Sequence, residues 1–389
     1  MSTPVFFALS PDYRHENLRP ALEKVMTPLL ERIGGAADKT FMIKPNLLSW
    51  RKAEDPSCTH PQVILNCAKL LLDNGAAKVA VIENPGTRDT PSIIRDMGLS
   101  DALKSLGVEV ANCARYETTD LAPEARCRRM ELAAEFRDFD AVVNLAKAKT
   151  HAMMTITLAV KNLFGLVRGS ERFAWHLAAG ASYPHFADML IDIALTVKPQ
   201  INILDAVICM EGNGPGSGEP TFRGFLAGAE TPFALDAAVA PLLGAPDCPQ
   251  LAQMRQRGLL PETTAVGEIP EVETLRMPEK ENALDMSAYL PGFLARYLKK
   301  KLVSHPLVMV PRCIGCGVCA RVCPPQSLKI NGGKPDFDLK NCIRCYCCQE
   351  HCPQGAIVVK RTLLMRIAGR VENLLRRVAG ILHIRGRRG

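Results

Sequence analysis

The sequence of 389 residues is poor in aromatic side chains, which make up 5% of it, and it has no long uninterrupted apolar run. A membrane-spanning helix needs about 18 or more apolar residues in succession, so no such helix is expected. The apolar run at 5–9 has no basic flank and no small-residue cleavage site, so it lacks the pattern of a signal peptide. We therefore expect a cytoplasmic protein.

Acidic residues are almost missing from residues 360–389, where Glu372 stands among nine Lys and Arg. The net charge of +8 is therefore concentrated in this tail, and the rest of the chain is close to neutral. Nucleic-acid binding is not expected, because the charge is local and aromatic residues are few. No Gly-x-Gly-x-x-Gly fingerprint follows the early predicted strands, so flavin and nicotinamide cofactors are not expected either.

Most of the chain alternates between apolar runs, which predict buried strands, and stretches with apolar residues three and four apart, which predict helices. This alternation is typical of an α/β fold in which a largely parallel sheet has helices on its faces. The expected strands are 5–9, 40–48, 78–83, 141–146 and 201–210, and the expected helices are 21–33, 61–74, 92–106, 155–167, 184–197 and 233–243.

The length suits two or three domains, and the periodic pattern weakens between about 245 and 290. Three consecutive lysines at 299–301 then mark an exposed approach to the next unit. We predict an α/β domain at 1–305, a small α+β module at 306–359 and a basic tail at 360–389.

Nine of the fifteen cysteines lie between 313 and 352. They form two runs of the same pattern, Cys-x2-Cys-x2-Cys-x3-Cys-Pro, and Cys347 lies outside the pattern as a predicted bystander thiol. This spacing suits metal ligands and indicates a reducing compartment, whereas secreted proteins use cysteines for disulfides. Zinc is the alternative metal, but zinc ribbons pair two Cys-x2-Cys knuckles and do not repeat the longer run.

The repeated run resembles that of bacterial two-cluster ferredoxins over about forty residues. In such a run three thiolates hold one 4Fe–4S cluster, and the fourth points to the neighbouring cluster. The resemblance implies electron transfer between the two clusters. The predicted ligands are Cys313, Cys316, Cys319 and Cys352 for cluster one, and Cys342, Cys345, Cys348 and Cys323 for cluster two.

Positive side chains follow the predicted strand 141–146. Lys147, Lys149 and His151 occupy alternate positions, so they project from one face if the strand continues. A helix start near Thr155 would add free backbone amides, which favour a bound anion. These features predict an anion pocket, against the alternatives of solvated lysines and a structural histidine.

Other segments can reach the same crevice, because the carboxyl ends of parallel strands meet at one edge of a sheet. A glycine-rich loop at 211–220 follows another strand, although it lacks the Gly-Lys-Ser ending of a phosphate-binding loop. The further contacts predicted for the pocket are Lys44, Asn46, Lys161, Asn162, Gly212 and Gly214.

Four motifs resemble the domain of unknown function 362 family. They are Lys-Ala-Lys-Thr-His at 147–151, Lys-Asn-Leu-Phe-Gly at 161–165, Ile-Leu-Asp at 203–205 and Met-Glu-Gly-Asn-Gly-Pro at 210–215. The resemblance covers roughly residues 40–245. Members of this family are often fused to ferredoxin modules and are described as uncharacterised iron–sulfur proteins, so the resemblance implies an architecture and assigns no reaction.

The function that we expect is that of a reductase. Its clusters would deliver electrons to an anionic substrate or cofactor held by Lys147, Lys149 and the residues at 161–162. His151 would donate the proton, because the pKa of histidine lies near neutral pH. The alternatives are a non-enzymatic electron carrier or docking subunit that recognises a redox partner protein, and an accessory protein in cofactor maturation.

The tail has apolar residues three and four apart from 364 to 382, with arginines between them, which predicts a basic amphipathic helix. Such a helix can lie on an anionic membrane surface, so weak contact through residues 361–385 at the inner membrane face is one expectation. Docking on protein, or disorder, is the alternative that we favour, because the tail has no aromatic anchors.

Overall fold

The computed structural model describes most of the chain except the tail. The residues described are 2–48, 50, 55–85, 88–169, 171–172, 175, 183–216, 218–278, 305–323, 325–342 and 346–360. The amphipathic helix predicted in the tail therefore lies outside the described residues. Within them, no helix is long and apolar enough to cross a bilayer.

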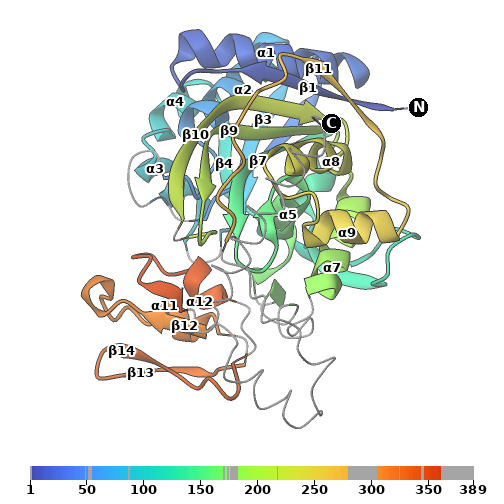
Figure 1. Ribbon diagram of the computed structural model, residues 1–389. Helices are drawn as coiled ribbons and strands as arrows, with labels where there is room; N and C mark the ends of the chain where they lie inside the picture. Colours follow the sequence, from blue (N-terminus) through green and yellow to red (C-terminus); the bar gives the residue numbers. More distant parts are fainter. Residues whose placement is uncertain are drawn as a thin grey trace, which may run out of the picture.

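A nine-stranded sheet forms the centre of the larger part of the chain (Figure 1). Its strands are β1 (Thr3–Leu9), β2 (Thr40–Pro45), β3 (Lys78–Glu83), β4 (Glu109–Asn112), β7 (Ala141–His151), β8 (Thr155–Thr157), β9 (Ile201–Glu211), β10 (Glu219–Ala229) and β11 (Thr263–Gly267). The order is β11-β1-β10-β9-β7-β2-β3-β4, and β8 pairs with the end of β7. β9, β7, β2, β3 and β4 run parallel, whereas β10 is antiparallel to both neighbours. The expected α/β fold with a largely parallel sheet is confirmed.

Helices cover both faces of this sheet, and a separate buried apolar cluster lies beneath each layer. One layer consists of α1 (His15–Arg32), α2 (Pro61–Asp73), α3 (Thr90–Asp96) and α4 (Ser100–Ser105). The other consists of α5 (Ala159–Asn162), α7 (Tyr183–Val197), α8 (Pro232–Leu242) and α9 (Pro249–Gln256).

Local sequence explains several helix ends. His60, Asp89 and Thr231 each accept a backbone hydrogen bond from the first turn of α2, α3 and α8, and a proline follows in that turn. The single helix predicted at 92–106 is two helices, because Gly98 takes a φ of +72° and ends α3.

Other expectations were wrong in detail. The segment predicted as a helix at 155–167 contains the short strand β8, then α5, then the 3-10 turn η2 (Leu163–Leu166). Nearly all side chains of this segment are buried, so the spacing of its apolar residues did not distinguish a strand from a helix. The ends of the predicted loop at 211–220 belong to β9 and β10. The sequence analysis also missed β4, β10, β11, α9 and the hairpin of β5 (Tyr116–Asp120) and β6 (Arg129–Ala133).

The cysteine runs lie in a small module of two antiparallel strand pairs and two short helices. β12 (His305–Val308) pairs with β15 (Ile357–Lys360), and β13 (Leu328–Asn331) pairs with β14 (Lys334–Phe337). α11 (Val318–Arg321) packs on α12 (Cys347–Glu350). Figure 1 shows this module, in orange and red, below the sheet with α12 on the side facing it.

Candidate functional site

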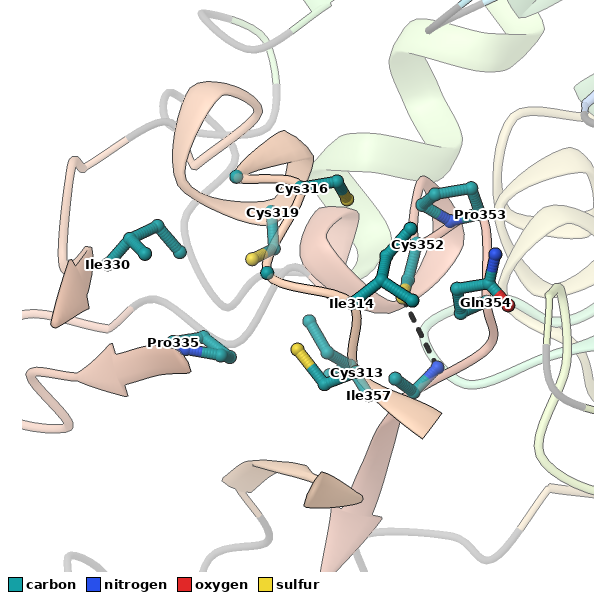
Figure 2. Close-up of a pocket in the computed structure, with 13 residues that line it drawn as sticks. Cys313, Ile314, Cys316, Cys319, Ile330, Pro335, Cys352, Pro353, Gln354 and Ile357 are labelled. Carbon is teal, nitrogen blue, oxygen red and sulfur yellow. Dashed lines mark hydrogen bonds between the residues drawn. The ribbon is translucent and has the colours of Figure 1, made fainter. Parts of the chain in front are cut away.

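Four cysteines surround one cavity in the module (Figure 2). Cys313, Cys316 and Cys319 come from the first run, and Cys352 comes from the second. The pairing of β12 with β15 brings the start of one run close to the end of the other. The structure thus gathers the four residues that the sequence analysis placed on cluster one.

Glycines between these cysteines shape the loop. Gly315 and Gly317 have φ of +71° and +72°, which L side chains rarely adopt. A Cβ on Gly315 would also lie 2.5 Å from the carbonyl oxygen of Gly333. The loop can therefore wrap its thiols around the cavity only with glycine at this position.

The charges in this cavity fit an iron–sulfur cluster. Burial, together with the neighbouring thiolates of Cys352, Cys316 and Cys313, raises the pKa of Cys319 to about 11. Four thiolates in one place repel each other, and bound iron removes this penalty by holding them deprotonated. The amide of Ala356 donates to Cys352 Sγ at 3.2 Å, as the dashed line in Figure 2 shows.

The second set of ligands is described in part. Cys348 on α12 is buried with Cys319 and Cys352 in the small core of the module, and Cys323 packs against that core. Cys342 is partly buried, and Cys345 lies outside the described residues. The assignment of these four cysteines to cluster two stays a prediction.

A second cavity, which we call the junction cavity, lies between the sheet and the module. Lys149, Lys161 and Arg172 line it on the sheet side, and Cys347 and His351 line it on the module side. Its empty volume is about 670 Å³, including the space at its mouth. A ligand bound here would lie next to the iron–sulfur module.

A chain of four asparagine side chains leads to one of these cations. Asn144 Nδ2 donates to Asn202 Oδ1 at 2.9 Å, and Asn162 Nδ2 donates to Asn144 Oδ1 at 2.8 Å. Asn46 Nδ2 donates to Asn162 Oδ1 at 3.1 Å, and Lys149 Nζ donates to Asn46 Oδ1 at 2.8 Å. The network fixes Lys149 at the cavity wall and brings together three predicted pocket residues.

Lys161 is held at the wall by the start of α5. Asp236 on α8 accepts the amides of Ala159 at 2.8 Å and Val160 at 3.2 Å. Burial raises the pKa of Asp236 to about 7, although these two amides lower it. Lys161 itself is 9% exposed, and its Nζ lies 5.7 Å from the ring centroid of Phe164.

No hydrogen bond or ion pair joins Lys161 to another described residue, so its largely buried side chain has no acidic partner there. A charge with reduced access to water and no partner is costly. The position of Lys161 therefore favours a negatively charged ligand in the junction cavity.

Arg172 is a cavity residue that the sequence analysis missed. Its Nε donates to Val167 O at 3.0 Å, and its Nη2 donates to the carbonyl oxygens of Asn84 and Gly165, both at 2.6 Å. These bonds are made to backbone carbonyls, which every residue carries, and Asn84 is distant along the chain, so no motif indicated them.

Lys44 has a different role from the one predicted. It is fully buried and pairs with Glu83 at 2.6 Å, so its charge is neutralised inside the protein. A Cβ on Gly165 would lie 2.4 Å from Glu83 Oε1 and 2.6 Å from Lys44 Nζ. The glycine of the Lys-Asn-Leu-Phe-Gly motif is therefore required by this ion pair.

Lys147 and His151 do not line the junction cavity. Lys147 Nζ is bound to Asp205 Oδ2 at 2.8 Å and to the Tyr13 hydroxyl at 2.9 Å. His151 is buried, and its Nδ1 accepts the amides of two residues in the turn after β7, Met153 and Met154. The structure therefore separates both residues from Lys149 and Lys161, with which they were predicted to act.

The glycine-rich loop is not an anion cradle either. The amide of Gly212 donates to Arg276 O at 2.6 Å, and the amide of Gly214 donates to Gly212 O at 2.9 Å. The loop instead contacts the module, because Gln349 Nε2 on α12 donates to Asn213 O at 3.0 Å.

Comparison with known proteins identifies both parts of the chain. The profile of the domain of unknown function DUF362 matches residues 42–241, which include the sheet side of the junction cavity. The chain belongs to the DUF362 family. A 4Fe-4S dicluster domain matches residues 312–356 of this DUF362 protein. Its module therefore binds 4Fe–4S clusters and serves electron transfer, and zinc is not supported.

Two relatives are similar to different lengths of the DUF362 protein. A thylakoid-associated protein of Synechocystis sp. is 32% identical over 242 residues, which are 60% of this chain and 74% of the relative. The delta subunit of an NADH-dependent phenylglyoxylate dehydrogenase from Aromatoleum evansii is 39% identical over 50 residues. That match covers 13% of this chain and about half, 54%, of the subunit.

Among solved structures, the lactate racemase apoprotein of Thermoanaerobacterium thermosaccharolyticum is similar with a TM-score of 0.39 and 14% identity. The similarity covers 67% of this chain and 58% of that one.

Proposed function

We propose that this DUF362 protein is an iron–sulfur oxidoreductase that exchanges electrons with an anionic substrate or cofactor in the junction cavity. One observation carries the proposal. Lys161 is nine-tenths buried without an acidic partner among the described residues, in a cavity whose opposite wall belongs to the iron–sulfur module. An anion in the cavity would offset this charge and would lie beside the electron-transfer module.

The module would hold two 4Fe–4S clusters, each of which supplies one-electron transfer when bound. Cys313, Cys316, Cys319 and Cys352 would hold the first. The second would be held by Cys342, Cys345, Cys348 and Cys323. Cys347 lines the junction cavity, and the next residue along the chain, Cys348, is a predicted ligand of the second cluster. A ligand of that cluster would therefore be the sequence neighbour of a residue that borders the bound anion.

The sheet side of the cavity would bind and orient the anion. Lys149 and Lys161 are charged donors, and charge-assisted hydrogen bonds are shorter and stronger than neutral ones. Asn46 and Asn162 keep Lys149 in place through their side-chain amides. Because His151 and Lys147 lie away from this wall, they are not part of the proposed site.

Electrons would reach the module from a redox partner protein that carries them at low potential. Ile314, beside Cys313 in the wall of the cysteine cavity, is 66% exposed, and Met309 and Val310, five and four residues earlier in the chain, are also exposed. An exposed apolar surface next to a redox site suits a transient protein contact.

The test uses protein purified without oxygen, which should contain about eight irons per chain. After reduction with dithionite and removal of the excess, carboxylate-bearing and phosphate-bearing organic oxidants are added, and cluster reoxidation is followed by absorbance. We expect at least one to reoxidise the wild type and to act about tenfold more slowly on Lys161→Gln, which lacks the cation.

Oxidised methyl viologen, a cationic acceptor, is the control, and it should react equally with the wild type and Lys161→Gln. If every anionic oxidant also reacts equally with both, the cavity is not the site of electron exchange.

An electron-transfer subunit is the second candidate, and the similarity of the module to a dehydrogenase subunit favours it. In that case the clusters would exchange electrons only with protein partners. Reoxidation by a partner protein with no response to any small anion would support this function.

The thylakoid-associated relative raises a further proposal, that the basic residues 361–385 contact a membrane surface. Co-sedimentation with vesicles that contain anionic lipids tests it on the full chain. Truncation after Lys360 should abolish binding, and unchanged binding would exclude the tail as the anchor.

A further inference from the structure

Two cations in the junction cavity have no acidic partner among the residues that the structure describes. Lys161 Nζ and Arg172 Cζ lie 5.7 Å and 6.0 Å from the same ring centroid, that of Phe164. The three hydrogen bonds of Arg172 leave from Nε and Nη2, so its Nη1 makes none to a described residue. Two positive groups therefore remain available beside the ring of Phe164.

The acid in the described part of the wall does not neutralise them. This acid is Glu83, and its carboxylate is bound by the buried Lys44 at 2.6 Å. The two charges of this pair neutralise each other, and Gly165, which has no side chain, leaves room for the pair. The charges of Lys161 and Arg172 are thus left for a ligand to offset.

The backbone that carries Lys161 and the guanidinium of Arg172 are positioned before a ligand binds. Asp236 fixes the first turn of α5, which carries Lys161, and three backbone carbonyls fix the guanidinium of Arg172. Groups held in place lose little freedom on binding, so more of their attraction appears as affinity. The arrangement is that of a preformed two-point clamp.

We propose that the ligand carries two negative charges, either on one phosphate or on two neighbouring carboxylates, and that Lys161 and Arg172 bind them. This inference rests on the proposed function and names its ligand class. A dianion offsets both charges, whereas a monoanion would offset only one of them. Leu158 and Phe164 line the same cavity and would contact the carbon part of the ligand.

The experiment measures binding of three probes to the anaerobic holoprotein by calorimetry, at one ionic strength set with chloride. The probes are inorganic phosphate, malonate and acetate. We expect phosphate or malonate to bind at least about tenfold more tightly than acetate, and the tighter of the two identifies the source of the charge. Lys161→Gln and Arg172→Gln should each weaken that probe by about tenfold or more.

Matched variants control for charge and folding. Arg168→Gln removes an exposed arginine four residues before Arg172 that is paired with Glu131, and it should bind like the wild type. Lys161→Arg keeps the charge and should retain binding. A loss in Lys161→Gln that Lys161→Arg restores therefore supports a role of the charge.

Three results would overturn the inference. If acetate binds as tightly as the dianions and depends on Lys161, the two-charge class is wrong while the proposed function stands. If no probe binds and Lys161→Gln also leaves reoxidation by every anionic oxidant unchanged, both fail. If Lys161→Gln changes a cluster potential but no anion affinity, the cations serve the cluster and the clamp is wrong.

Discussion

The two described parts of the chain are stabilised in different ways. The sheet and its helices bury a large apolar cluster on each face, which is sufficient to drive folding. The main core of the module has six buried residues, of which three are cysteines: Cys319, Cys348 and Cys352. A unit this small cannot bury enough apolar surface by itself, so its fold depends on metal coordination.

This difference also separates the two cavities. The cysteine cavity has thiols whose charged form is disfavoured without a metal, and the junction cavity has Lys149 and Arg172 held by hydrogen bonds. One site is completed by its cofactor, and the other is formed before the proposed ligand binds. The following experiments test this contrast, starting from the largest expected effect.

Loss of iron should unfold the module and leave the sheet folded. We expect Cys319→Ala or chelation to make residues 305–360 accessible to protease and to hydrogen exchange, because iron coordination links the two cysteine runs. Mass spectrometry of exchange measures both regions at once. Cys347→Ala should retain iron, since this residue is outside the predicted ligand sets, and loss of iron in that variant would contradict the assignment.

Gly165→Ala should destabilise the sheet region by about 3 kcal/mol, because the new Cβ would collide with the buried pair of Lys44 and Glu83. The urea midpoint of the sheet transition measures the effect. Gly169→Ala is the control, as a Cβ there meets no atom within 4 Å. Equal midpoints for the two variants would show that the ion pair tolerates a side chain.

Asp236 should make the stability of the sheet region depend on pH. Its pKa is raised from 3.8 to about 7 by burial, so the folded state binds a proton more tightly than the unfolded state. The free energy of unfolding should therefore fall as the pH rises from about 4 to about 7, by a few kcal/mol at most. Asp236→Asn cannot ionise and should flatten this dependence in denaturant titrations across that range.

Lys334 should raise the reduction potential of the first cluster. Its Nζ donates to the carbonyl oxygen of Cys313 at 2.7 Å, and a nearby positive charge stabilises the reduced, more negative cluster. Lys334→Gln should lower the potential by about 40 mV, the one-electron equivalent of ~1 kcal/mol, in a redox titration followed by electron paramagnetic resonance. Lys329→Gln changes an exposed lysine on the neighbouring strand and should have no comparable effect.

The outcome of the sequence predictions follows this contrast between the two parts. The cysteine runs are local patterns with fixed spacing, so the metal of the module could be predicted from the chain alone. The junction cavity depends on residues from several strands, and its lining was predicted in part. Asn46, Lys149, Lys161 and Asn162 meet as expected, because the carboxyl ends of parallel strands share one edge.

The predictions for Lys147 and Lys44 failed because each of these lysines has an acidic partner. Lys147 and Lys44 are equivalent to Lys149 by residue type and strand position, yet Asp205 and Glu83 neutralise them. Arg172 follows no motif and is held in the cavity wall by two nearby carbonyl groups and by that of the distant Asn84.

The amino-acid sequence alone thus determined the alternation of strands and helices, the class of metal and the end of the sheet where charge gathers. These properties depend on residue type and on spacing along the chain. Only the tertiary structure decided that Lys147 and Lys44 pair with Asp205 and Glu83, because charge balance depends on neighbours in space. The tertiary structure also placed Cys347 and His351 in the wall of the cavity that Lys161 lines. This arrangement arises only when the module docks on the sheet.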